Sequence, residues 1–118
     1  MPFDTGALAF GDIVLVPFPF TDQSATKRRP AVVISAEAYN ADHPDVILMP
    51  VTSQIRADAR PDDAIVEDWK QAGLLKPSAI KPVIATLEQT LVVRRLGKVG
   101  ERDRRALRSM LDGILGGP

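Results

Sequence analysis

The chain has 118 residues, the size of one compact domain, and we expect residues 1–118 to form a single unit. It contains no cysteine, which excludes a disulfide scaffold, a thiol nucleophile and thiolate metal ligands. Its 15 basic and 15 acidic side chains cancel, which argues against a domain that grips duplex nucleic acid by overall charge. Neither a membrane-spanning stretch nor a secretory signal is visible, so we expect a cytoplasmic protein without membrane association.

Short apolar runs rich in β-branched residues predict strands at 13–16, 30–35 and 46–52. Because proline cannot donate to a sheet ladder, Pro17 predicts that the first strand ends, or becomes an edge, by Phe18. Polar segments without periodicity predict loops at 21–29 and 53–62, and residues 37–44 read as a connection.

The second half of the chain predicts a short strand at 64–66 and a helical turn at 68–72 that Gly73 stops. Two further strand candidates follow at 79–85 and 91–99. Apolar residues between 106 and 115 then recur at the i, i+3, i+4, i+7 spacing of an amphipathic helix. Short strands, proline-rich edges and one terminal helix predict an α+β fold, a small and strongly curved antiparallel β-barrel with a C-terminal amphipathic helix.

Two predicted loops carry candidate functional side chains at the positions where they adjoin a strand. Lys27, Arg28 and Arg29 precede one strand, and Thr52 with its neighbours follows another. If these strands are antiparallel neighbours, Arg29 and Thr52 lie close together. A guanidinium beside a hydroxyl suits a phosphodiester, because its planar fork binds phosphate oxygens and stabilises added charge. The structural alternative is that Arg29 caps a strand end and Thr52 makes a hydroxyl-to-backbone turn.

The sequence predicts no metal site and no cofactor. Its single histidine, His43, lies in a predicted loop without carboxylates at ligand spacing. The acidic residues around 58–68 read as solubilising charges, and no glycine-rich phosphate loop or nucleophile elbow occurs.

Four segments, in order, resemble the MazF/PemK family of toxin endoribonucleases. They are residues 11–18 (GDIVLVPF), 27–35 (KRRPAVVIS), 50–54 (PVTSQ) and 72–78 (AGLLKPS), and the apolar C-terminal helix adds to them. The resemblance covers nearly the whole chain. Its most specific part is the Gly-Asp strand opening, with Arg-Pro before a second strand and Thr after a third.

The resemblance implies an SH3-like barrel that forms a homodimer and belongs to a type II toxin–antitoxin system. It implies metal-independent cleavage of single-stranded RNA, usually mRNA, at short sequences, leaving a 2′,3′-cyclic phosphate and a 5′-hydroxyl. The family's catalytic Arg and Thr match Arg29 and Thr52. It also implies a cognate antitoxin protein whose flexible, often acidic segment occupies the RNA groove.

Other side chains of these two loops are candidates for RNA binding. Phe18 or Phe20 could stack an unpaired base, although a Phe beside an apolar strand is also typical of a core. Lys27 and Arg28 could hold flanking phosphates. The polar side chains that could read base edges are Gln23, Ser24, Ser53 and Gln54, and Asp22 in the first loop is a further candidate for RNA binding.

The first loop departs from the family pattern. Where many members carry a glutamate, this chain has residues 22–26 (DQSAT), so Asp22 is the only carboxylate there that could act as a base. A catalytically silent RNA-binding barrel therefore stays open as an alternative. A second alternative is a CcdB-like gyrase poison, which typically needs a Trp near the end of the terminal helix, whereas the single Trp here is Trp69.

A basic run between Arg94 and Arg108 has seven basic and two acidic residues. It is either a face that guides RNA or the solvated side of the terminal helix.

Overall fold

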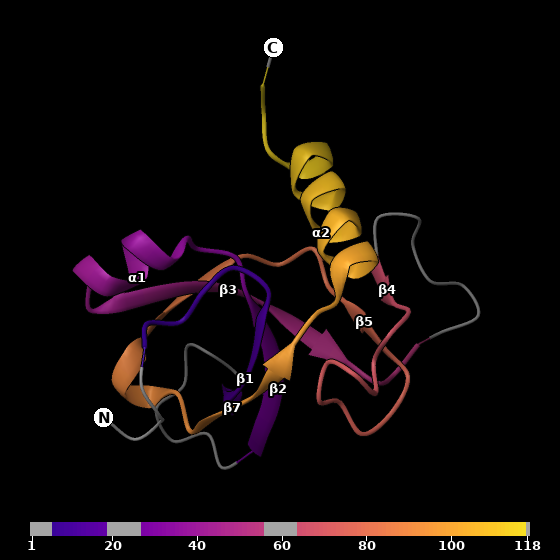
Figure 1. Cartoon of the computed structure of the whole chain (residues 1–118), viewed down its shortest axis with the longest axis horizontal. Helices are drawn as coiled ribbons and strands as arrows, with labels where there is room; N and C mark the ends of the chain where they lie inside the picture. Colours follow the sequence, from indigo (N-terminus) through magenta and orange to yellow (C-terminus); the bar gives the residue numbers. More distant parts are fainter. Residues whose placement is uncertain (1–5, 19–26, 56–63, 118) are drawn as a thin grey trace.

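The computed structural model describes residues 6–18, 27–55 and 64–117, and it combines one curled antiparallel sheet with a C-terminal helix (Figure 1). The chain begins with a hairpin of long strands and ends in the longest helix. The elements are β1 (Asp12–Phe18), β2 (Lys27–Val33), α1 (Glu37–Asp42), β3 (Asp45–Thr52), β4 (Ala64–Val66), β5 (Ser78–Ile80), β6 (Ala85–Glu88), the short 3-10 helix η1 (Gln89–Leu91), β7 (Arg94–Lys98) and α2 (Glu101–Ile114).

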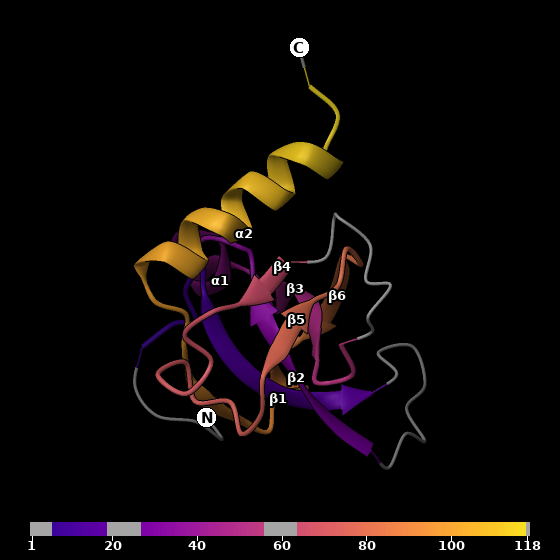
Figure 2. The ribbon, with the colours of Figure 1, turned by 90° about the vertical axis from the view of Figure 1, so that its right-hand side faces the viewer.

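The strands follow the order β4-β5-β3-β2-β1-β7, and β6 pairs with the first half of β3. Every pairing is antiparallel. Figure 2 shows the sheet curling around its own core, with α2 lying across one end. The predicted α+β fold, with a strongly curved antiparallel sheet and a C-terminal helix, is confirmed, and the sheet is a curled half-barrel.

The boundaries of β1 and β2 differ from the prediction. β2 begins at Lys27 rather than at residue 30, and β1 runs on through Pro17 to Phe18. Pro17 is tolerated within β1 because the β1–β7 ladder ends before it. Pro17 lies beyond the last β1–β7 pair, which joins Leu15 to Arg94, so its missing N–H removes no ladder bond.

Successive side chains along each strand point to opposite faces of the sheet, so each face carries its own part of the hydrophobic core. One cluster contains Val14, Val16, Ala31 and Val33, and the other contains Ile13 and Val32 together with Leu107 of α2. Both faces are therefore buried along the central strands, which explains their continuous apolar sequences. Each fully buried aliphatic side chain contributes about 1.5–3 kcal/mol through removal from water.

Two helical segments differ from the prediction. Residues 37–42, expected to be a connection, form α1, whose Asn40 is buried and donates to the carbonyl oxygens of Leu8 and Ser35. Helix α2 begins at Glu101, about a turn and a half before the predicted start, because its first residues are charged and lack the apolar period. The expected strand over 79–85 is interrupted and becomes β5 and β6.

A buried carboxylate fastens the first turn of α2 to the segment after β4. Asp103 is only 2% exposed, and its two oxygens accept the backbone N–H groups of Glu67 at 2.8 Å and Asp68 at 2.9 Å. Arg102 adds a bidentate contact to Asp68, with both N···O distances 2.9 Å. The helix is thus anchored at its N-terminal end.

Near this anchor, the backbone at Gly73 lies directly against the backbone at Gly97. A Cβ atom on Gly73 would overlap the carbonyl oxygen of Leu96, and one on Gly97 would overlap that of Ala72. Gly73 also has φ of +90°, a conformation that glycine adopts without strain. The segment after β4 can therefore approach β7 only because both positions lack side chains.

The Asp103 anchor generates a stability prediction. In an Asp103→Asn variant the side-chain amide places an N–H donor against a backbone N–H, so we expect a loss of about 1–3 kcal/mol in the free energy of unfolding, measured by urea denaturation. Glu101→Gln is the matched control, because it removes a charge from the same helical turn at an exposed position. It should change stability by at most about 0.5 kcal/mol. Equal losses in the two variants would contradict the anchoring role.

Candidate active site

The basic segment 27–29 lies in a strand and not in the predicted loop. Lys27, Arg28 and Arg29 are exposed in the first half of β2, where they pair with Phe18, Pro17 and Val16. Side chains alternate along a strand, so Lys27 and Arg29 share one face and Arg28 lies on the other. The ladder to β1 holds the backbone of Arg29 in place.

Thr52 is the last residue of β3, and its side chain is partly exposed. Its Oγ1 accepts a hydrogen bond from the backbone N–H of Gln54 at 3.1 Å, so the hydroxyl-to-backbone turn considered from the sequence is present. That bond uses one lone pair of the hydroxyl, which keeps its own hydrogen for donation to a ligand. Ser53 and Gln54 follow as exposed side chains.

The relation between Arg29 and Thr52 follows from the register of their strands. β2 and β3 are antiparallel neighbours, as the sequence analysis assumed, and their pairs end at Ala31–Pro50. Arg29 precedes Ala31 by two residues and Thr52 follows Pro50 by two, which places both on the same face at the same end of the sheet. Contact between their side chains stays a prediction.

Beyond that last pair, the two strands take different partners. Arg29 stays opposite Val16 in β1, whereas Thr52 lies opposite Ala79 in β5. The end of the sheet therefore presents a cation and a hydroxyl from strands that no longer pair with each other. This arrangement can bind an oxyanion such as a phosphodiester.

Four of the predicted RNA-binding residues lie outside the described residues. They are Phe20, Asp22, Gln23 and Ser24. The described candidates, Lys27, Arg28, Ser53 and Gln54, are exposed. Phe18, the alternative stacking residue, is partly exposed at the end of β1 opposite Lys27.

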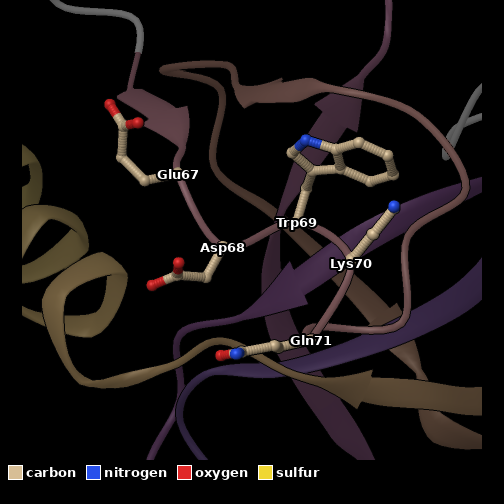
Figure 3. A pocket seen from close by; sticks show the side chains of 5 residues that line it. All are labelled: Glu67, Asp68, Trp69, Lys70 and Gln71. Carbon is tan, nitrogen blue, oxygen red and sulfur yellow. The ribbon is translucent and has the colours of Figure 1, made fainter.

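A shallow hollow of about 270 Å³ lies elsewhere, on the segment after β4, and is lined by residues 67–71 (Figure 3). Figure 3 shows the indole of Trp69 and the side chain of Lys70 on one side, with the Asp68 carboxylate pointing the other way. The Nζ atom of Lys70 is 5.7 Å from the Trp69 ring centroid. The Arg102 guanidinium, hydrogen-bonded to Asp68, lowers the pKa of that carboxyl, and Asp68 in turn raises the pKa of Arg102.

Within the described parts of the chain, no group of three or more His, Asp or Glu side chains is placed to hold a metal ion. His43 is exposed, stacks on Tyr39 with ring centroids 3.9 Å apart, and contacts the Tyr39 carbonyl oxygen through Nδ1 at 2.9 Å. Among the described helices, none has the length and apolar character needed to cross a bilayer.

The basic run 94–108 divides between β7 and α2, and several of its arginines have local partners. Arg95 lies 3.4 Å from the Asp12 carboxylate, Arg102 binds Asp68, and Arg105 lies 3.8 Å from Glu101. Arg104 and Arg108 contact the ring of Phe10. Five of the seven basic residues of the run therefore contact neighbouring groups of the chain.

Comparison with known proteins identifies relatives over almost the whole chain. A family model described as "PemK-like, MazF-like toxin of type II toxin-antitoxin system" matches residues 9–115, which confirms the resemblance drawn from the sequence. No curated protein matches the chain by sequence.

Solved structures share the fold. A mycobacterial endoribonuclease in complex with its cognate antitoxin superposes with a TM-score of 0.73 at 19% identity, over 97% of this chain and 98% of that one. A MazE–MazF complex from Deinococcus radiodurans gives 0.75 at 20% identity, over 97% and 100%. MazF from the same organism gives 0.74 at 23% identity, over 96% and 100%.

The Asp68–Arg102 pair generates a titration prediction. Since the pKa of Asp68 is lowered in the folded chain, this carboxylate stabilises the fold above its ordinary pKa, and the contribution disappears as pH falls through the lowered value. In an Arg102→Gln variant we expect the pKa of Asp68 to rise, measured by carboxyl NMR shifts against pH. Arg105→Gln, on the same helix, should leave it unchanged. An unaltered Asp68 titration in the Arg102 variant would refute this cause.

Proposed function

Because the chain belongs to the PemK-like, MazF-like toxin family of type II toxin–antitoxin systems, we propose that it is an endoribonuclease that cleaves single-stranded RNA, chiefly mRNA, at short sequences. The observation that carries the proposal is the placement of Arg29 and Thr52. Both lie on one face at one end of the sheet, on strands that are antiparallel neighbours, with Arg29 exposed and Thr52 partly exposed.

The proposed reaction is an internal transesterification. The 2′-oxygen of one nucleotide attacks the adjacent phosphorus, the new P–O2′ bond forms, and the bond to the 5′-oxygen of the next nucleotide breaks. The 2′-hydroxyl gives up its proton and the leaving 5′-oxygen takes one up. The products are a 2′,3′-cyclic phosphate and a 5′-hydroxyl, and no water is consumed.

Arg29 is assigned to the negative charge that builds on the phosphorane oxygens. Its guanidinium presents planar N–H donors to two oxygens, and a guanidinium stays positively charged in proteins, which makes it a poor base but a constant cation. Thr52 is assigned to a hydrogen bond with a phosphate oxygen or with the 2′-hydroxyl. Asp22, which lies outside the described residues, is the carboxylate proposed to accept the 2′-proton.

The neighbouring side chains are assigned to binding. Lys27 and Arg28 would hold flanking phosphates, Phe20 would stack an unpaired base, and polar side chains would read base edges. The proposed readers are Gln23, Ser24, Ser53 and Gln54. Lys27 lies on the same face of β2 as Arg29, so it would bind the RNA phosphate nearest the scissile one.

We further propose a cognate antitoxin and a homodimer, both in the cytoplasm, with no metal or cofactor in the reaction. The antitoxin is supported by two of the similar structures, which are complexes of a toxin with its antitoxin. The gyrase-poison alternative is less well supported, because Trp69 lies in the segment after β4 and not at the end of α2.

Removing the Arg29 guanidinium tests the proposed chemistry. Arg29→Ala should lower kcat by about 1000-fold, the scale expected for losing a preorganised charge in the transition state. The measurement is cleavage of a long single-stranded RNA in EDTA with end-group mapping of the products, which should carry 5′-hydroxyl ends. Arg28→Ala is the matched control on the opposite face of the same strand, and it should mainly weaken binding and reduce its salt dependence. Intact RNA with the unmutated chain would overturn the nuclease proposal.

A pair of substitutions separates the hydroxyl of Thr52 from its shape. Thr52→Val keeps the branched side chain but loses the hydroxyl, and we expect kcat to fall about 100-fold. Thr52→Ser keeps the hydroxyl and should retain activity within about tenfold. Single-turnover cleavage rates distinguish the two. If both variants cleave at the normal rate, Thr52 serves only the turn with Gln54.

A further inference from the structure

The segment before β5 presents three exposed residues between two buried ones. Leu75, Lys76 and Pro77 are exposed, and Leu75 keeps 92% of its surface open to solvent. Leu74 before them and Ser78 after them are only 6% and 4% exposed. We call residues 75–77 the tip. A single exposed leucine is ordinary on a protein surface, so the rigidity and the position of the tip decide what it can do.

The tip is held in place from both sides. The side chain of Leu74 packs into the core, and its backbone N–H donates to the carbonyl oxygen of Trp69 at 3.0 Å. On the other side, Oγ of Ser78 donates to the carbonyl oxygen of Lys76 at 2.8 Å. Pro77 fixes one backbone dihedral between these anchors. The tip is therefore preorganised, and a ligand that binds it orders little additional backbone.

The tip lies at the same end of the sheet as Thr52. β5 begins at Ser78, and the next residue, Ala79, pairs with Thr52 of β3. Because these strands are antiparallel, the chain enters β5 at the end where it leaves β3. Lys76 comes three residues before Ala79, so its backbone lies within about 10 Å of the residue opposite Thr52.

The exposed side chains of the tip suit a nucleotide. The ion pairs found in the described parts of the chain involve Arg95, Arg102 and Arg105, and none of them uses Lys76. An uncompensated ammonium group can bind a phosphate. Leucine and proline are among the side chains that nucleic-acid-binding proteins place against base faces. The tip thus offers one cation and an apolar surface beside it.

We infer that the tip binds a nucleotide that flanks the scissile phosphate, with Lys76 on its phosphate and Leu75 against its base; this rests on the endoribonuclease activity proposed above. Neither side chain takes part in bond making or breaking. Lys76 adds affinity whatever the sequence, whereas Leu75 favours some bases over others at one position beside the cut.

A flanking nucleotide is the occupant whose size and connection match the tip. It is joined covalently to the phosphodiester assigned to Arg29 and Thr52, so it reaches the tip without further contacts. A protein partner, whether an antitoxin or a second copy of the chain, would have to cover about 800 Å² for a stable interface. Three side chains supply only a small part of such an area, so the tip by itself fits a nucleotide better.

The role of Lys76 is tested by binding. The probe is a mixed-sequence single-stranded 2′-O-methyl RNA, which the proposed reaction cannot cleave because its 2′-oxygen is capped. By fluorescence anisotropy, we expect Lys76→Gln to raise Kd severalfold and to lower the slope of log Kd against log salt by about 0.7, the value for one phosphate contact on a single strand. Lys98→Gln is the matched control, an exposed lysine at the opposite end of β1, and it should change Kd by less than about twofold.

The role of Leu75 is tested by mapping cleavage sites. Leu75→Ser should raise KM severalfold while kcat stays within about twofold, because binding is lost equally in the ground state and the transition state. It should also relax the base preference at one position beside the cut, measured by sequencing the product ends. Leu75→Met should keep the original preference. Leu115→Ser, at a leucine that is 56% exposed at the end of α2, should leave KM and the map unchanged.

Thermal unfolding of each variant verifies that the fold is intact. Normal Kd, salt dependence and cleavage map in both tip variants would overturn the inference. A changed antitoxin affinity or molecular mass, with normal RNA binding, would also overturn it and reassign the tip to a protein contact. Intact RNA with the unmutated chain would overturn the nuclease proposal instead, and weaker binding of the 2′-O-methyl RNA by Lys76→Gln would still support the tip as an RNA contact.

Discussion

The missing N–H of Pro30 determines where the β2–β3 ladder ends. Pro30 lies opposite Leu15, and since it cannot donate, that pair must be a non-hydrogen-bonded one, with the Pro30 nitrogen facing β3. A further β2–β3 pair at Pro30 would need the donor that proline lacks, and pairing indeed stops at Ala31–Pro50. Arg29 and Thr52 therefore come directly after the point where the two strands separate. A rigid ladder on one side of each residue positions the backbone, while the side chains remain accessible to a ligand.

A second constraint fixes the other end of the molecule. The buried Asp103 carboxylate holds the first turn of α2 against the segment after β4, and Leu107 packs one turn later into the core. With its N-terminal half anchored, the helix carries its C-terminal half beyond the sheet (Figure 2). The apolar side chains Met110, Leu111 and Ile114 of that half still pack against the core, whereas Leu115 at the C-cap is exposed.

Much of this fold could be predicted from the sequence, because β-branched apolar runs mark the central strands and the helical period marks α2. The errors have physical causes. Residues 27–29 read as a loop since all three are charged, yet a strand end that protrudes from the core can carry charges on both faces. The role of Asp103 gave no local signal, because its partners are the backbone N–H groups of residues 67 and 68, more than thirty positions away. Arg29 and Thr52 could be nominated from the sequence because each adjoins a predicted strand, and the condition that these two strands are antiparallel neighbours is met by β2 and β3.

Although the net charge of the chain is zero, its arginines gather at places that lie far apart along β1. Arg29 lies near the far end of β1, whereas Arg104 and Arg108 contact Phe10 just before its start, and β1 is about 20 Å long. A partner segment of a few residues that covers one of these groups therefore leaves the other uncovered. A second segment of that partner, tethered by the first contact, would reach Arg29 at a high effective concentration even if its own affinity were low. A partner that binds both groups can therefore bind tightly overall even where each contact is weak, because the first contact raises the local concentration at the second.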